Sequence, residues 1–341
     1  MPQNAFNNKE YFNAEITELQ KRRNKFDVLY IEIGGHLLVD EHAARVLPGY
    51  KKDNKLQMIK RFKETAFVYC INSKELNKNN TWGTSKKKIE EIALYEIKKL
   101  KEKGLDFLCV VLGMYTNKQK KSVKFKKKLE EKGIKVLTTK TISGYPKKLE
   151  NVFGKNGFAS QTFLKTKKKM IVVTGIGADS GKMFFCLSQI YHLEKNGIDA
   201  GYAKIETFPV WNLPITHEVN LAYEAATADI KDKVMIDPFY KKTYGKIAIN
   251  YNRDINAFPV LKKIILKITS KKNFMQSYFS PTDMGINMVK KGIVNDKKIR
   301  EASAKEIRSR HKKFLEKYQM KKEKKETIVR LERIISEISV K

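Results

Sequence analysis

A stretch near the middle of the chain constrains the fold most, because a β-branched run, a glycine-rich loop and an apolar segment follow one another there. Residues 170–174 are predicted as a strand, residues 175–181 as a loop, and residues 182–196 as a helix that ends before Gly197. Residues 200–205 have the pattern of a second strand. This order predicts a βαβ unit, in which parallel strands are covered by a helix.

The first 150 residues show the same alternation of strands and helices. Apolar runs at residues 28–33, 67–71, 107–112 and 134–137 are predicted as strands, and residues 86–103 as a helix with one apolar face. Alternating elements of these two kinds are typical of a mostly parallel sheet. The chain is therefore predicted to be an α/β protein.

Polar residues interrupt the pattern before residue 170, and we place a domain boundary there. An N-terminal α/β domain is predicted for residues 1–150, and a second, P-loop-like α/β domain for residues 151–294. Residues 295–341 are predicted as a charged helical segment. Its last helix has an apolar stripe from Ile328 to Ile338 with little in the sequence to cover it. This helix packs back on the body, leads to a further domain, or joins another subunit.

The net charge is the unusual feature of the composition. Seventy basic residues against 37 acidic ones give +33, which favours a polyanionic partner. Only ten of the basic residues are arginine, and no known nucleic-acid-binding motif is found. We therefore expect no specific nucleic-acid binding, and non-specific binding of polyanions through lysine-rich helix faces is a weaker alternative.

The cysteines and the apolar segments indicate the compartment. Cys70, Cys109 and Cys186 lie in apolar runs without metal-ligand spacing, which predicts buried thiols in a reducing environment and no structural metal. The N-terminus lacks the apolar core of a signal peptide, and no apolar run is long enough to span a bilayer. We expect a cytoplasmic protein that does not bind membranes.

The glycine-rich loop has the context of a phosphate-binding loop, between a strand and a helix. Glycines let successive backbone N–H groups face an anion, the helix N-terminus adds positive charge, and a lysine there can reach terminal phosphates. The predicted ligand is ATP or another nucleotide with Mg²⁺. The residues predicted to bind it are Gly175, Gly177, Ser180, Gly181 and Lys182. A turn that binds nothing is the alternative.

Two features depart from the usual motif. Four residues normally separate the first glycine from the Gly-Lys pair, whereas Gly175 gives five and Gly177 gives three. Met183 stands where Ser or Thr would bind Mg²⁺, so another group or water must complete the coordination of the metal ion. The five-residue spacing and the strand ending in Lys204 resemble dethiobiotin synthetase and its relatives, a resemblance that implies that Lys204 faces a substrate.

The segment after the second predicted strand is rich in groups that bind ligands. Lysine is absent from residues 208–229, and ligands of open α/β sheets bind beyond the carboxyl ends of strands. The candidate substrate-binding residues in this segment are Thr207, Trp211, Asn212, His217, Asn220 and Glu224. A loop with a helix cap is the alternative interpretation.

Two arginines complete the candidate substrate site. Arg45 is a candidate clamp for a carboxylate or a phosphate, because a guanidinium binds such groups through two parallel hydrogen bonds. Arg253, flanked by Asn252 and Asp254, is either a buried ion pair or an anion contact.

Several blocks of this sequence resemble a bacterial family of uncharacterised proteins, the family of domain of unknown function 1846. The blocks, which follow the order expected for the family, are residues 42–50, 201–214, 220–229, 235–239, 250–254 and 280–287. The resemblance implies a bacterial origin, and it implies that family members continue for roughly one more domain beyond the point at which this chain ends. It implies no particular reaction.

Our leading hypothesis is a protein that binds a nucleotide or another phosphorylated small molecule, for phosphoryl transfer or ATP-dependent ligation. The candidate catalytic residues are Lys182, which neutralises phosphates, Lys204 and Glu206, which face the second substrate, and Asp179 or Glu206 as the base. The alternative is a non-catalytic binding or assembly protein in which the loop is a turn. We expect a homo-oligomer in either case.

Overall fold

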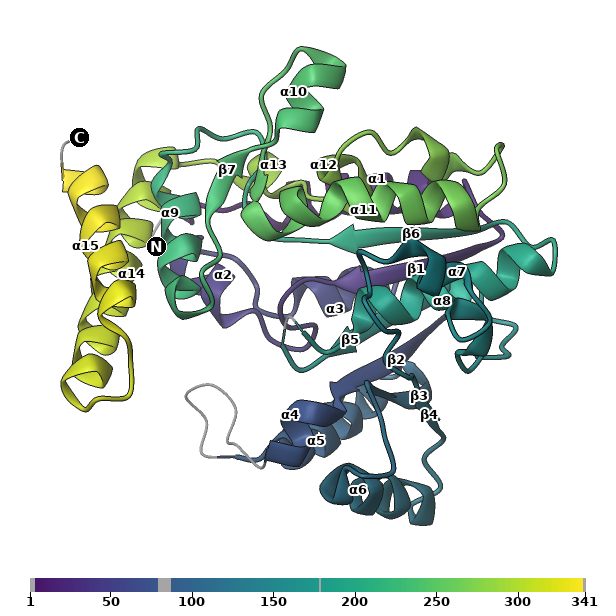
Figure 1. Cartoon of the computed structure of the whole chain (residues 1–341). Helices are drawn as coiled ribbons and strands as arrows, with labels where there is room; N and C mark the ends of the chain where they lie inside the picture. The colour runs from purple at the N-terminus through teal and green to yellow at the C-terminus, as the bar shows by residue number, and fades with distance from the viewer. Residues whose placement is uncertain (1–3, 79–86, 178, 340–341) are drawn as a thin grey trace.

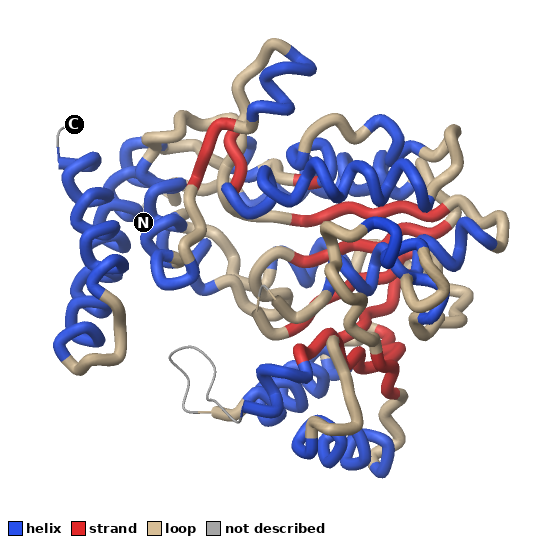
Figure 2. The backbone as a smooth tube through the Cα atoms, in the orientation of Figure 1, coloured by secondary structure: helices blue, strands red, loops and turns tan. Residues whose placement is uncertain are grey.

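A parallel sheet forms the centre of the molecule in the computed structural model, which describes residues 4–78, 87–177 and 179–339. Seven strands within these ranges pair in the order β4-β3-β2-β5-β1-β6-β9, and every pair is parallel. Figures 1 and 2 show the sheet with helices packed around it. The strands are β1 (Val28–Ile33), β2 (Thr65–Asn72), β3 (Asp106–Gly113), β4 (Val136–Thr138), β5 (Met170–Gly175), β6 (Ala200–Ile205) and β9 (Gly285–Ile286).

The α/β class and the parallel strands are confirmed, and each predicted strand is present within a few residues of its predicted bounds. The strands from both sides of residue 150 share one sheet, because β5 lies between β1 and β2, with Tyr30 opposite Ile171 and Phe67 opposite Val172. The boundary near residue 150 therefore does not separate two sheets. As a division into domains it stays a prediction.

Helices account for most of the rest of the chain. The predicted helix at residues 182–196 is α8, and the predicted helix at residues 86–103 is α5, whose first predicted residue lies outside the described residues. The helices are α1 (Asn8–Arg23), α2 (Glu41–Val46), α3 (Asn54–Ile59), α4 (Ser73–Lys78), α5 (Ile89–Glu102), α6 (Lys120–Glu131), α7 (Leu149–Phe153), α8 (Lys182–Lys195), α9 (Glu218–Ala226), α10 (Pro238–Tyr244), α11 (Asn252–Ile268), α12 (Pro281–Met284), α13 (Val289–Gly292), α14 (Asp296–Gln319) and α15 (Lys325–Ser339).

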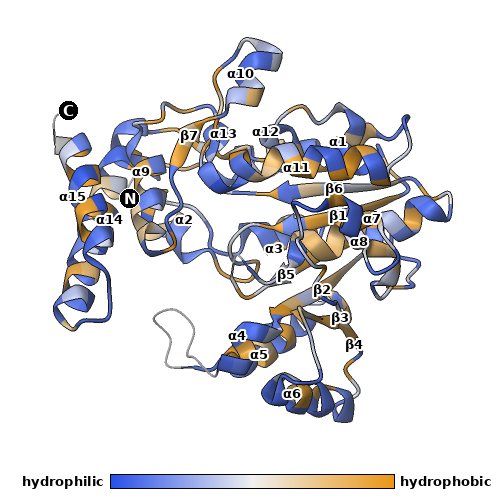
Figure 3. Cartoon of the chain, in the orientation of Figure 1, coloured by the Kyte–Doolittle hydropathy of each residue, from blue (hydrophilic) through white to orange (hydrophobic). Residues whose placement is uncertain are grey.

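The main core lies along the sheet, where strands are covered by α8 and other helices. Every residue of β2 and of β5 is buried, as expected for central strands of a parallel sheet. Figure 3 shows hydrophobic residues on the strands and hydrophilic ones on the outer helices. Cys70, Cys109 and Cys186 are buried and unpaired. In the part of the chain that is described, no helix combines the length and the hydropathy needed to cross a membrane.

The C-terminal segment is helical and charged, as predicted, but its last helix does not lack a partner. Helix α15 packs against α14 and α9, beside the sheet region (Figure 1). Leu331 and Ile334 of the apolar stripe are 0% exposed and belong to a second core with residues of α9 and α14. The expectation that little would cover this stripe is therefore wrong, and of the three alternatives the structure shows packing on the body.

An arm projects from the body between the second core and α11. It consists of the antiparallel strands β7 (Val234–Ile236) and β8 (Ile249–Tyr251) with α10 between them, and α10 contacts α12 and α11 through Tyr244 and Phe239 (Figure 1). No residue of α10 is buried.

Candidate functional site

The carboxyl ends of β5, β1 and β6 bring the candidate residues together, because these three strands are neighbours in that order. Glu32, near the end of β1, lies opposite Val173 of β5 on one side and Lys204 of β6 on the other. The glycine loop follows β5 and Glu206 follows β6. Parallel strands place these side chains at one edge of the sheet, where ligands of open α/β sheets bind.

The glycine loop is held closely against β2. A Cβ at Gly175 would lie 2.1 Å from the backbone oxygen of Cys70, so only glycine fits there. Asn72, at the end of β2, donates its amide hydrogen to the backbone oxygen of Asp179 at 3.0 Å. Gly181 has a φ of +86° and precedes α8 without a side-chain cap. No side chain caps this helix, so its first N–H groups have no side-chain acceptor from the capping position, and an anion could bind there.

Lys182 turns its side chain back into the loop. Its Nζ donates to the backbone oxygen of Gly177 at 2.9 Å and to the Oγ of Ser180 at 3.2 Å, and it lies 3.8 Å from an Oε of Glu32. The side chain is 5% exposed. A buried ammonium whose carboxylate neighbour is beyond hydrogen-bonding distance is incompletely compensated, and an anion in the loop would complete its coordination.

Glu32 is a residue of this edge that the sequence analysis did not select. It is buried, and its other Oε accepts a hydrogen bond from the hydroxyl of Tyr202 at 2.8 Å. The sequence feature that could have identified it is an acidic residue inside an otherwise apolar strand, which ends directly before Gly34 and Gly35.

Lys204 joins the buried carboxylate of Glu206 and the partly exposed carboxylate of Asp254 into a cluster next to Glu32. Its Nζ lies 2.6 Å from Glu206 and donates to Asp254, at the start of α11, at 2.7 Å. Burial by itself would lower the pKa of Lys204, but the carboxylates of Asp254, Glu206 and Glu32 outweigh it and raise the pKa well above its usual value. Lys204 is therefore an ammonium ion at neutral pH. The sequence analysis treated Asp254 only as a neighbour of Arg253.

The pKa of Glu206 is raised in this cluster. Burial raises its pKa from 4.5 to about 7, against the opposing effect of Lys204. A carboxylate with such a pKa can accept a proton from a substrate at physiological pH, which is the property expected of a general base.

Arg253 lies beside the same cluster and forms an ion pair. Its guanidinium donates to Asp232 at 3.0 Å. Burial would lower the pKa of Arg253, but the carboxylates of Asp232 and Asp254 raise it, and Asp179 of the loop contributes to that increase. Arg253 thus forms an ion pair, but its side chain is 42% exposed, so the pair is not the buried one of the first alternative. The exposed Asp179 lies within electrostatic range of it.

Thr207 continues this edge into a second buried ion pair. Its hydroxyl donates to Asp40 at 3.1 Å, and the same carboxylate oxygen accepts from the Nζ of Lys55 at 2.8 Å. Lys55 also donates to the backbone oxygen of Gly34. Burial would raise the pKa of Asp40, but Lys55 lowers it below its usual value, so the pair is charged. Thr207 therefore supports the backbone at the ends of β1 and β6.

His217 and Asn220 hold the start of α9. His217 accepts a hydrogen bond from the backbone N–H of Val219 and contacts Asp296 through its other ring nitrogen at 2.9 Å. Asn220 bonds both backbone groups of Val210. These contacts are those of the loop-and-helix-cap alternative.

Glu224 and Arg45 pair with the C-terminal helices and not with the edge of the sheet. Glu224 contacts Arg333 at 2.7 Å and Arg330 at 3.1 Å, both on α15. Arg45 binds Glu306 of α14 at 2.9 Å. Arg45 thus forms an ion pair within the chain through its Nε, and its role as a clamp for a substrate stays a prediction.

Trp211 and Asn212 lie in the loop between β6 and α9. The indole ring of Trp211 packs against Gly285 of β9, where a Cβ would approach it to 2.5 Å. Asn212 is exposed and its backbone oxygen accepts a hydrogen bond from Lys290. Of the predicted substrate-binding residues, Thr207 and Arg253 lie with Lys204 and Glu206, and His217, Asn220 and Glu224 hold α9. Arg45 pairs with α14, and Trp211 packs on β9.

A metal ion at the loop would depend on few protein ligands. Among residues 4–78, 87–177 and 179–339, no three His, Cys, Asp or Glu side chains gather as a metal site. Glu32 and Ser180 are the oxygen-bearing groups next to Lys182 that suit Mg²⁺, which usually keeps several waters and binds substrate phosphates.

Comparisons with known proteins agree with the sequence blocks noted above. A family model described as "Domain of unknown function DUF1846, N-terminal" matches residues 4–339. A UPF0371 protein of Streptococcus pyogenes serotype M1 is 41% identical over 338 residues, covering 98% of this chain and 67% of the relative. One of Streptococcus pneumoniae (strain Hungary19A-6) is 40% identical over 342 residues, covering 100% and 68%. The chain spans about two thirds of the length of these relatives, and neither name states an activity.

Proposed function

The chain belongs to the family of domain of unknown function 1846, and from that premise we propose that the edge formed by β5, β1 and β6 binds a nucleotide or another phosphorylated small molecule for phosphoryl transfer or ATP-dependent ligation. The observation that carries the proposal is the buried Lys182 at the first position of α8, enclosed by its own glycine loop. A lysine in this position reaches the terminal phosphates of a ligand held by loop N–H groups.

The contacts of Lys182 are those that a phosphate would replace. A backbone oxygen and a hydroxyl now accept hydrogen bonds from its ammonium group, and both are neutral acceptors. A phosphate oxygen would also carry a negative charge, so it would add Coulombic attraction to the hydrogen bond from the ammonium group.

Glu32 supplies an oxygen ligand for Mg²⁺, which the side chain of Met183 lacks. In P-loop NTPases an acidic residue outside the loop helps to hold Mg²⁺ at the β- and γ-phosphates. Glu32 lies on the strand paired with β5, next to Lys182, and can hold Mg²⁺ directly or through water. The proposed cofactor is accordingly a nucleotide with Mg²⁺.

Lys204, Glu206 and Asp254 define the proposed place of the acceptor. Lys204 stays protonated, so it acts as a cation toward charge that develops during transfer and not as a nucleophile. Glu206 accepts a proton from the acceptor. Asp254 holds the ammonium of Lys204 in place. We propose that this chemistry takes place in the cytoplasm, in keeping with the unpaired buried thiols.

Thermal unfolding in the presence of ATP with Mg²⁺, GTP with Mg²⁺ and pyrophosphate tests this function. A ligand at a hundred times its Kd stabilises the wild type by about 2.7 kcal/mol. Lys182→Ala is expected to lose most of that stabilisation. Lys195→Ala removes the same charge from the exposed end of α8 and is expected to keep it.

Two results would contradict the proposal. One is an equal shift in wild type and Lys182→Ala, and the other is the absence of any shift in the wild type with all three ligands. Glu32→Gln separates folding from binding, because it keeps the size of the side chain. It is expected to weaken the effect of Mg²⁺ with ATP more than the effect of pyrophosphate alone.

The arm formed by β7, α10 and β8 favours assembly as a second candidate function. Met235, Ile236, Tyr244 and Ile247 are exposed on it, and Ile247 is 64% exposed. Apolar residues gathered on a projecting element are typical of a protein interface. The molar mass from light scattering should then exceed that of one chain and should fall for Ile247→Asp, whereas a monomeric wild type excludes this function.

A further inference from the structure

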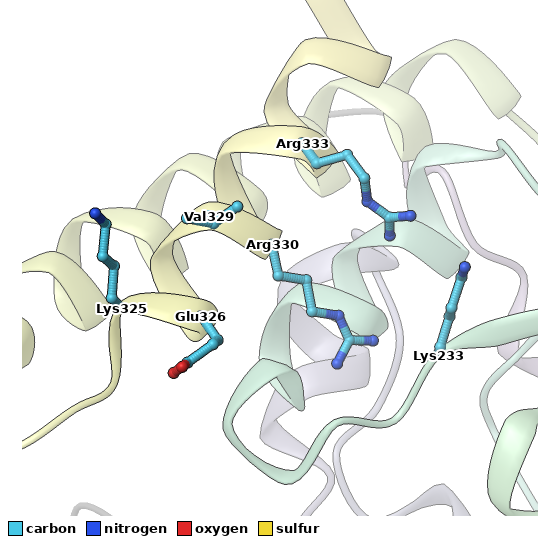
Figure 4. A pocket seen from close by; sticks show the side chains of 6 residues that line it. All are labelled: Lys233, Lys325, Glu326, Val329, Arg330 and Arg333. Atoms are coloured by element: carbon cyan, nitrogen blue, oxygen red, sulfur yellow. The ribbon is translucent and has the colours of Figure 1, made fainter.

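A cationic pocket lies against the C-terminal helix α15. It has a volume of about 450 Å³ and is formed by α15 and the residue before β7. Its lining residues, labelled in Figure 4, are Lys233, Lys325, Glu326, Val329, Arg330 and Arg333. Pockets of 300–1,000 Å³ are typical of sites for small molecules.

Positive groups dominate this pocket. Figure 4 shows the side chains of Arg330, Arg333 and Lys233 extending toward the same space. The two guanidinium groups share one oxygen of the buried Glu224, whose other oxygen accepts from the backbone N–H of Val234. Glu224 is thus shared by two guanidinium groups, each of which has five N–H donors, and Glu337 adds a partly exposed carboxylate 3.7 Å from the Nε of Arg333.

The two lysines have unused hydrogen-bonding capacity. Both are exposed, and within the described part of the chain neither ammonium group forms a hydrogen bond or an ion pair. Glu326 is the acidic residue of the lining, and Val329 is exposed. The pocket therefore has an excess of positive charge together with an apolar contact surface from Val329 and the aliphatic parts of the long side chains.

We propose that this pocket is a second binding site, which takes a small phosphate-bearing molecule. Guanidinium groups bind phosphate through paired hydrogen bonds, and lysines add charge without fixed geometry. The volume admits a small molecule such as a sugar phosphate or a nucleotide. None of its lining residues belongs to the glycine loop, so this site does not depend on the function proposed above.

The pocket also lies next to Asp232, the residue that binds Arg253. Arg330 donates a hydrogen bond to the backbone oxygen of Asp232, and the carboxylate of Asp232 binds Arg253. Two neighbouring residues thus link the two places: Asp232 binds Arg253, and Lys233 lines the pocket.

Titration calorimetry with pyrophosphate tests the second site. Wild type and Lys182→Ala are titrated first, at physiological ionic strength. Lys182→Ala lacks the proposed loop site, so binding to it reports on the second site alone. Lys233→Ala/Lys325→Ala is the variant for the pocket, and it should fold because both side chains are exposed. Lys241→Ala/Lys242→Ala on α10 is the control, because it removes the same charge from exposed positions elsewhere.

We expect Lys182→Ala to bind pyrophosphate at one site. Adding Lys233→Ala/Lys325→Ala should weaken this binding about tenfold or more, since each charge-assisted hydrogen bond contributes strongly. The α10 control should change the affinity less than twofold. Equal weakening by both pairs would mean attraction by net charge alone and would overturn the proposal, as would a Lys182→Ala chain that binds no pyrophosphate. A wild type that binds pyrophosphate only at the site retained by Lys182→Ala would contradict the function proposed above and not the second site.

Discussion

Glu15→Gln is expected to make the protein more stable at neutral pH. Glu15 lies on α1, is 0% exposed, and accepts a hydrogen bond from the backbone N–H of Met288 at 2.8 Å. Its second carboxylate oxygen has no hydrogen-bond partner among the described residues. Burial raises the pKa of Glu15 from 4.5 to about 8, although the Met288 bond and Lys55 oppose it. Gln has the same size, keeps an acceptor for Met288 and does not ionise.

The sign of the effect follows from proton binding. Between pH 4.5 and about 8 the folded protein keeps the proton that the unfolded chain releases, so ionisation of Glu15 destabilises the fold progressively as the pH rises. The cost is absent below pH 4.5 and complete above about pH 8. It grows by about 1.4 kcal/mol per pH unit and reaches about 3 kcal/mol at pH 7.

Urea unfolding of both proteins between pH 5 and pH 8 measures this difference. Subtracting the wild-type free energy of unfolding from that of the variant removes the contribution of the large net charge, which both share. Glu301→Gln, an exposed position on α14, serves as the control and should show a change within about 0.5 kcal/mol at every pH. A difference for Glu15→Gln that is independent of pH, or a variant less stable than wild type at pH 7, would refute the reasoning.

Three further substitutions can be followed by the same urea midpoints. Gly175→Ala places a Cβ 2.1 Å from a backbone oxygen of β2 and should cost about 3 kcal/mol, and a cost below 1 kcal/mol would contradict the close approach of the loop. Leu331→Ala opens a cavity between α15 and α14 and should cost about 2–5 kcal/mol. Val329→Ala, at an exposed position of the same helix, should change stability by less than about 0.5 kcal/mol. Equal effects of the two substitutions would argue against the packing of α15. Lys204→Ala leaves the buried Glu206 and the partly exposed Asp254 without their shared cation and should cost about 3–5 kcal/mol. Combining it with Asp254→Asn should restore part of the loss if the two groups are coupled.

The strands, the glycine loop and α8 could be predicted because their signals are local. A run of β-branched residues and the glycines from Gly175 to Gly181 lie within a dozen positions, and backbone conformation depends mainly on such neighbours. The same locality placed Lys182 at the start of a helix. It also placed Lys204 and Glu206 at the end of a strand, and the structure brings both to the edge that carries the loop.

The order of the strands was decided by tertiary structure. Strand β5 inserts between β1 and β2, pairing with residues that lie more than 90 positions earlier in the chain, and no local pattern specifies such a pairing. This insertion brings Glu32 next to Lys182, which is why the sequence analysis missed Glu32.

The partners of the polar side chains also depended on the tertiary structure. Arg45 meets Glu306 across 261 positions and Glu224 meets Arg330 across 106, so their chemistry alone left substrate binding and internal ion pairs equally open. The sequence determined which segments become strands and helices and which side chains can carry charge. The packing of those segments decided which charges meet, because an ion pair depends on the distance between two atoms in space and not on their separation along the chain.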